Sequence, residues 1–228
     1  MPDGTSFSAT TLMREGFRAL VRPPFFWLSG LGILGVIATS PIEQEDAAVL
    51  FGIAVVTVIS AYSTIGLTLA AAEQEPDRNP ETWIRAAVLR RCLLRSFVAG
   101  IFAYILVVAG LFALLVPGFI VGAALALADI AAVLENHAPG DALRRSVDLT
   151  KPARRPIGIV FGLLVILPGG ALQAALYLAE IEPDWLRTAA QCATHLLSSA
   201  AHIALTKAFL TLGGRKLDRK MKPTPQRP

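Results

Sequence analysis

The chain repeatedly switches between long apolar stretches and short polar segments, and this alternation constrains its fold more than any other feature. A helix of about 20 apolar residues crosses the hydrocarbon core of a bilayer. Of the 228 residues, 54% are hydrophobic and 17% are charged, whereas soluble domains carry about 25% charged residues. The sequence therefore predicts an all-α integral membrane protein with six transmembrane helices in three hairpins, at residues 25–39, 47–71, 96–115, 119–134, 156–178 and 186–212.

The basic residues lie beside alternate ends of these stretches. Arginines precede the first stretch, separate the second from the third and follow the fourth, and the C-terminal residues 215–228 are also basic. Segments 40–46 and 179–185 carry acids and neither Lys nor Arg. By the positive-inside rule, we expect both termini on the cytoplasmic side of a bacterial inner membrane. Residues 1–214 then form one membrane domain, followed by a basic disordered tail at 215–228.

Three basic segments, each ahead of a hairpin, have the pattern of amphipathic helices: residues 6–22, 80–95 and 139–151. A basic amphipathic helix beside a span usually lies in the headgroup region, so we expect all three on the cytoplasmic membrane surface. The expected apolar faces are Leu12, Phe17, Leu20 and Val21 in the first segment, and Leu143, Val147 and Thr150 in the third. The spacing also predicts i, i+4 ion pairs in the third, Asp141–Arg145 and Arg144–Asp148.

Glycine and proline interrupt the second half of the chain. Gly118 with Gly122, and Gly158 with Gly162, form G-x-x-x-G pairs that favour close helix contact. The Pro-Gly at residues 117–118 predicts a tip that either turns tightly or bends back within the bilayer. A second Pro-Gly, within residues 167–170, predicts a kink or a break in the fifth span.

Asp129 is the most unusual residue, because an acid inside an apolar stretch is costly and usually faces a partner or a wet cavity. Lys207 lies at a similar depth on the sixth span, so we expect the two to pair. Two roles for Asp129 are open at this point: a proton or ion site, or half of a structural ion pair.

His195 and His202 are seven residues apart and share one face of the sixth span. Such a polar stripe usually forms hydrogen bonds between helices. No Cys or acid stands beside them at metal-ligand spacing, so we expect neither a metal nor a cofactor. The sequence also lacks phosphate-loop, zinc-protease, nucleophile-elbow and EF-hand motifs, so it assigns no catalytic residue.

The expected partners are membrane lipids, with anionic headgroups meeting the basic residues on the cytoplasmic face. Other membrane proteins or a second copy of the chain are further candidates. The basic residues sit at helix ends rather than in a nucleic-acid patch, so no nucleic acid is expected. The candidate headgroup contacts are Arg90, Arg91, Arg144, Arg145, Lys151, Arg154 and Arg155.

Residues 117–151 resemble a bacterial membrane family. Its pattern is a Pro-Gly at the start of a span, an apolar helix ending in Glu, and an Ala-Leu-Arg-x-Ser-x-x-Leu-Thr surface helix. These elements are Pro117-Gly118, Glu135 and residues 142–150 here. The family is the membrane domain fused to some glycerophosphoryl diester phosphodiesterases, with its stand-alone relatives. The resemblance implies an inner-membrane protein without the catalytic barrel and carries no catalytic residue over; Asp129 replaces the family's usual apolar residue.

Three functions are compatible with these features. The leading hypothesis is a non-enzymatic scaffold or accessory subunit, based on the G-x-x-x-G faces and the absence of a catalytic set. The alternative is a small transporter or permease that uses Asp129, since intramembrane charge and broken helices mark transport sites. This alternative predicts a water-accessible cavity that reaches Asp129, whereas the scaffold predicts Asp129 sealed against Lys207. An intramembrane lipid-modifying enzyme is the weakest candidate.

Overall fold

The computed structural model describes residues 8–39, 46–73, 93–113, 115–172, 175 and 184–214. Over these residues the regular structure is helical and contains no strand, which confirms the all-α class. The helices are α1 (Ala9–Leu20), α2 (Pro23–Thr39), α3 (Asp46–Glu73), α5 (Leu93–Ala113), α6 (Leu115–Leu125), α7 (Ala128–Leu134), α8 (Pro139–Thr150), η1 (Lys151–Ala153), α9 (Arg154–Phe161), η2 (Gly162–Leu172) and α11 (Asp184–Thr211).

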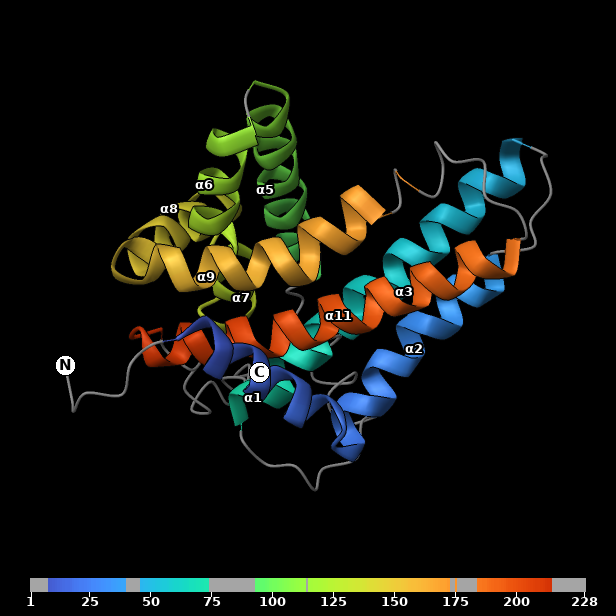
Figure 1. Ribbon diagram of the computed structural model, residues 1–228, viewed down its shortest axis with the longest axis horizontal. Helices are drawn as coiled ribbons and strands as arrows, with labels where there is room; N and C mark the ends of the chain where they lie inside the picture. Colours follow the sequence, from blue (N-terminus) through green and yellow to red (C-terminus); the bar gives the residue numbers. More distant parts are fainter. Residues whose placement is uncertain are drawn as a thin grey trace, which may run out of the picture.

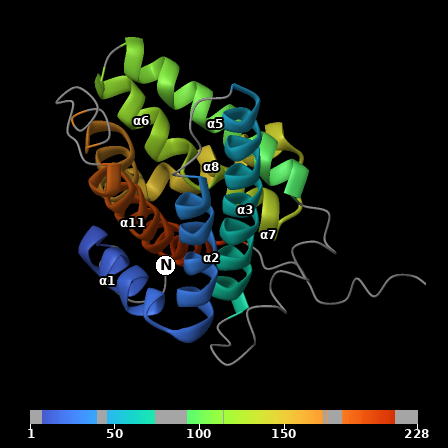
Figure 2. The same cartoon turned by 90° about the vertical axis from the view of Figure 1, so that its right-hand side faces the viewer.

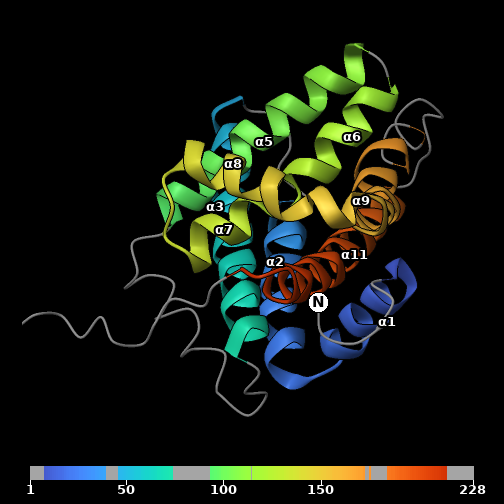
Figure 3. The same cartoon turned by 90° about the vertical axis from the view of Figure 1, so that its left-hand side faces the viewer.

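Two helical hairpins rise from a shared base and diverge. The α5–α6 hairpin stands upright in Figure 1, while the α2–α3 hairpin slants away from it. The base contains α7 and α8, and α11 runs along the α2–α3 hairpin with α1 beside it (Figures 2 and 3). The bent helix formed by α9 and η2 packs on both α6 and α11 and so connects the two halves.

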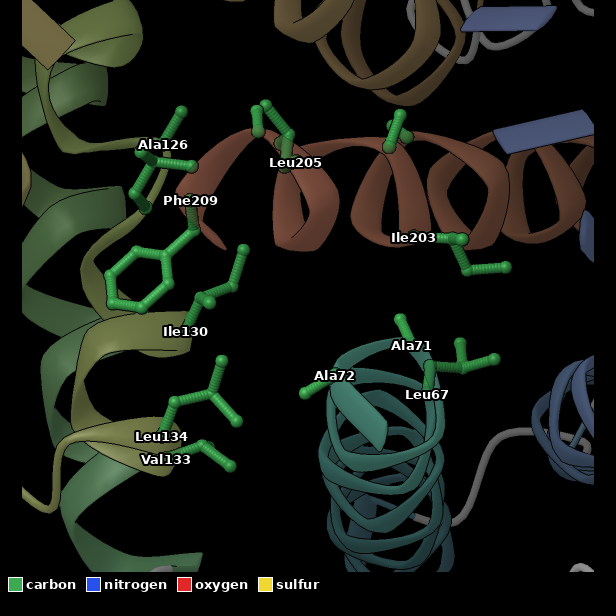
Figure 4. Packing of buried hydrophobic residues seen from close by; sticks show 14 of the residues in the cluster. Leu67, Ala71, Ala72, Ala126, Ile130, Val133, Leu134, Ile203, Leu205 and Phe209 are labelled. Atoms are coloured by element: carbon green, nitrogen blue, oxygen red, sulfur yellow. The ribbon is translucent and has the colours of Figure 1, made fainter. Parts of the chain in front are cut away.

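The buried core lies at this base. Every described apolar side chain of α7 is buried, because α7 is enclosed by α3, α5, α8 and α11. Figure 4 shows Ile130, Val133 and Leu134 pointing from α7 toward α3 and α11. The ring of Phe209 lies beside Ile130. Close packing of this kind fixes the relative positions of the helices.

The outer parts of the helices show the opposite pattern, with large apolar side chains exposed. The exposed set includes Leu34 and Ile37 of α2, Ile101, Phe102, Ile105 and Leu106 of α5, Phe119 and Ile120 of α6, Leu163 and Leu167 of η2, and Trp185 of α11.

By length and composition, one continuous helical stretch of the described chain, Pro139–Gly170, could cross a membrane. Shorter apolar helices cover Phe25–Leu34, Ile59–Ala72, Leu94–Val107 and Gly118–Leu134. Each of the six predicted spans falls largely within described helix, but six crossings stay a prediction.

A tight tip, one of the two forms expected near Pro117-Gly118, fits the structure, in which α5 ends at Ala113 and α6 begins at Leu115. Pro117 is the third residue of α6, where a missing N–H leaves no helical hydrogen bond unmade. Around Pro168 the helix is not broken; it widens into the π-helical η2. The break in this half of the chain lies instead at Ala126 and Leu127, between α6 and α7.

The amphipathic helix α1 lies against α11, and its predicted apolar face is wrong in part. The buried residues are Ala9, Leu12, Gly16 and Ala19, whereas Phe17 and Val21 are 40% and 80% exposed. A Cβ atom at Gly16 would stand 2.3 Å from the carbonyl oxygen of Ala200, so the α1 backbone contacts α11 directly. Of the segment 80–95, only residues 93–95 are described.

The helix α8 likewise buries a different face from the one predicted. Ala142, Ser146, Leu149 and Thr150 are buried, against α5, α6 and α7, while Leu143 and Val147 are half-buried. The predicted ion pairs are also wrong: Arg145 binds Glu135, and Asp148 lies 2.8 Å from Lys151. The interruption between α6 and α7 sets which face of α8 is buried, because the Ser146 and Thr150 hydroxyls bond to backbone groups there.

Candidate functional site

Ser146 and Thr150 stabilise the break between α6 and α7. The Ser146 hydroxyl donates to the carbonyl of Ala124 at 2.8 Å and accepts from the N–H of Leu127 at 3.1 Å. Thr150 also reaches Ala124, at 3.3 Å. These two backbone groups flank the interruption, and a buried backbone group without a partner would be costly. The helix can therefore restart at Ala128 and place Asp129 in its first turn.

The G-x-x-x-G pairs hold α6 against the bent helix of α9 and η2, as close-contact faces should. A Cβ at Gly162 would lie 2.3 Å from the Phe119 ring, and one at Gly122 would lie 2.8 Å from the Phe161 ring. Each aromatic ring thus fills the space left by a glycine on the facing helix. These predicted contact faces are confirmed, but they pack inside this chain.

A cavity of about 540 Å³ separates the two halves above the base. A small organic molecule fits a pocket of that size. The walls come from α3, α5, α6, α7, α9, η2 and α11 and are mainly apolar. The polar side chains that line it are Ser60, Thr64, Asp129, His195, Ser198, Ser199 and His202.

Asp129 faces His202 across this cavity. One carboxylate oxygen, Oδ1, accepts the N–H of Ile130 at 2.8 Å, and the other, Oδ2, lies 3.5 Å from His202 Nδ1. The far side of the imidazole, Nε2, is hydrogen-bonded to the Thr68 hydroxyl. The Asp129 and His202 side chains keep 27% and 13% of their surface exposed. The structure therefore connects α3, α11 and α7 through one polar chain.

This connectivity is that of a Ser-His-Asp triad with threonine in the nucleophile position. Thr68, however, is fully buried and does not line the cavity. A carbonyl group of a substrate could not approach its hydroxyl. The arrangement therefore does not support acyl transfer.

His195 of α11 also lines the cavity, and its ring lies against Gly32 of α2. Its Nε2 atom is buried and has no hydrogen-bond partner among the described residues. A Cβ at Gly32 would lie 2.0 Å from that nitrogen, so the ring occupies space that only glycine leaves free. The predicted histidine stripe is thus split: His202 makes a hydrogen bond between helices, and His195 packs against a glycine.

The predicted Asp129–Lys207 pair is wrong. Lys207 Nζ instead lies 3.4 Å from Glu15 of α1. Five helical residues separate His202 from Lys207, which is a rotation of about 140° around α11. Because His202 faces α7, Lys207 faces away from it, and depth alone could not reveal this difference.

A second polar cluster, at the end of α7, was not predicted. Arg145 forms a two-point ion pair with Glu135, at 2.9 and 3.1 Å, and also donates to the carbonyl of Gly213. His137 lies 2.8 Å from the same carboxylate. Arg95 donates to both oxygens of Asn136, which has a positive φ of 56°. Glu135 is only 8% exposed, so this ion pair is largely shielded from water on the side of its carboxylate.

The candidate headgroup residues divide into three groups. The first group is exposed to the surroundings and contains Arg144, Lys151, Arg154 and Arg155. Arg145 forms an ion pair with Glu135 instead. The hydrogen bond from Lys151 holds the pKa of Asp148 below its usual value, so the two charges offset each other on that surface. Arg90 and Arg91 lie outside the described residues.

Within the described ranges, no three His, Cys, Asp or Glu side chains gather as metal ligands. Comparison with protein-family models, curated proteins and solved structures finds no match to this chain. The resemblance to the phosphodiesterase-associated membrane family stays a prediction from residues 117–151.

Proposed function

We propose that this chain is an integral protein of the bacterial inner membrane, with six spans and both ends in the cytoplasm. Two observations support the proposal. Large apolar side chains are exposed on the outer parts of α2, α5, α6 and η2, where lipid would cover them. Basic residues of α1, α8 and α9 are exposed as well, and anionic headgroups would meet them at the membrane surface.

The topology is tested with a reporter fused after Pro228 and a second fused after residue 44. A reporter that is active only in the cytoplasm should work at the C-terminus and fail at the loop. Activity of the C-terminal fusion in the outer compartment would overturn the topology.

We propose further that the protein is a transporter or permease and that a small solute passes through this cavity. The observation that favours this function is that the cavity reaches Asp129, as the transporter hypothesis requires. A carboxylate that borders a cavity inside an apolar bundle is typical of transport pathways. The scaffold hypothesis rested partly on the G-x-x-x-G faces, and these pack within the chain.

Cysteine accessibility tests whether water enters the cavity. Gly100 lines it with open space at its Cβ position, while Ile105 on the same helix is an exposed apolar residue. After Cys92 and Cys192 are changed to Ser, Gly100→Cys should react with a charged, membrane-impermeant thiosulfonate in proteoliposomes. Ile105→Cys should not, because a thiol in hydrocarbon does not ionise. An unreactive Gly100→Cys that reacts once detergent is added would refute the solute pathway.

A further inference from the structure

The protonation of His202 is linked to the direction in which the neighbouring Thr68 hydroxyl donates its one proton. Thr68 Oγ1 lies 2.9 Å from the carbonyl oxygen of Thr64 and is also bonded to His202 Nε2. A hydroxyl group has one proton to donate. It can donate either to the Thr64 carbonyl or to the imidazole, but not to both.

Each choice fixes the protonation of the imidazole. If Thr68 donates to Nε2, that nitrogen is bare, and the neutral ring carries its proton on Nδ1, facing the Asp129 carboxylate. If Thr68 donates to Thr64, Nε2 must carry a proton to make its bond with the hydroxyl. The proton count could stay the same only if Nδ1 gave up its proton and faced the Asp129 carboxylate as a second acceptor at 3.5 Å, which the repulsion between two acceptors disfavours. The second arrangement therefore holds one more proton than the first.

We propose that Thr68, His202 and Asp129 form a binding site for a single proton that enters from the cavity. The added proton goes to His202 Nε2, and the Thr68 hydroxyl turns from the ring to the Thr64 carbonyl. The Nδ1 proton then stays on the ring or moves to the carboxylate. The net charge of the His202–Asp129 pair rises from −1 to 0 in either case. This inference rests on the proposed solute pathway, for which it names the proton as the coupling ion.

The surroundings leave this pair as the place where charge changes. Among the described residues of the cavity wall, the other titratable one is His195, which faces Gly32. Three basic side chains of the surrounding helices have other partners. Lys207 of α11 lies beside Glu15, Arg145 of α8 pairs with Glu135, and Arg95 of α5 donates to Asn136. The lining residues of α3, α5, α6, α9 and η2 are uncharged.

Histidine nitrogen NMR tests the proposal directly, because the chain has three histidines. The full-length protein, labelled with ¹⁵N-histidine and held in lipid bilayers, is titrated from alkaline to mildly acidic pH. The signals of His202, His195 and His137 are assigned by single replacements. We expect His202 Nε2 to change from bare to protonated, while Nδ1 carries or shares its proton at alkaline pH. A ring that keeps one protonation state throughout, or a titration suppressed by Na⁺ at constant pH, would overturn the proposal.

Two variants separate this mechanism from simple exposure of a histidine. Thr68→Val removes the acceptor of the protonated Nε2, and hydrogen bonds from charged groups are the stronger ones. We expect proton affinity at His202 to fall about tenfold, a shift of about one pH unit. Thr206→Val is the matched control, since its buried hydroxyl donates to the backbone carbonyl of His202. It should leave the midpoint unchanged; equal shifts in both variants would refute the proposed role of Thr68.

Asp129→Asn supplies an independent outcome. Without the carboxylate, the neutral ring should move its proton from Nδ1 to Nε2, bonding to Thr68. An unchanged tautomer would refute the pairing. These readouts need no transport, so a proton site can hold even if the cysteine test rejects the solute pathway.

Discussion

Replacing Ser146 with alanine should destabilise the protein far more than a typical serine replacement. The hydroxyl accepts from the N–H of Leu127 and donates to the carbonyl of Ala124, and both bonds are buried. In Ser146→Ala the Leu127 N–H loses this acceptor and the Ala124 carbonyl loses its nearest hydroxyl donor, since the one proton of Thr150 has a closer acceptor in the Ser146 carbonyl at 2.9 Å. A buried donor left without a partner costs about 1–3 kcal/mol. We therefore expect the free energy of unfolding to fall by about 2 kcal/mol.

Ser29 provides the matched control. It is also fully buried, but its hydroxyl has no hydrogen-bond partner within the described chain. Ser29→Ala removes an unsatisfied polar group, so stability should stay the same or rise by up to about 1 kcal/mol. Both variants are measured by titrating the protein from mild detergent into SDS and following helix content by circular dichroism. The reasoning is refuted if Ser146→Ala unfolds like the original protein, or if Ser29→Ala loses as much.

Three further predictions use the same unfolding titration. Gly162→Ala places a Cβ 2.3 Å from an aromatic ring and should cost about 1–3 kcal/mol, whereas Gly30→Ala, with open space, should gain about 0.5–1 kcal/mol; equal effects would contradict the packing. Arg145→Lys loses the two-point pair with Glu135 and should cost about 1 kcal/mol, allowing for its partial exposure, and a neutral result would count against that pair. Lys207→Ala should change stability by less than about 1 kcal/mol, because its pair is half-exposed; a large loss would point to a buried role.

Local sequence determined the helices of this protein. Apolar runs longer than about 12 residues favour helices over strands, so the all-α class and the approximate position of each long helix follow from composition and spacing. The glycine spacing likewise determined a close contact, because two glycines four residues apart open one side of a helix whatever lies opposite. The unusual position of Asp129 was visible for the same reason, since an acid in an apolar run stands out without knowledge of its neighbours.

The tertiary structure decided which side chains meet. The residues of a helix lie at known angles around its axis, but sequence does not say toward which neighbour each angle points. The partner of Asp129 is therefore His202 and not the expected Lys207, although both lie on α11. The buried face of α8 was set by a break in a different helix, where Ser146 was needed as a hydrogen-bond partner. Such a need arises only when α6, α7 and α8 are together, because it belongs to backbone groups far away in the sequence.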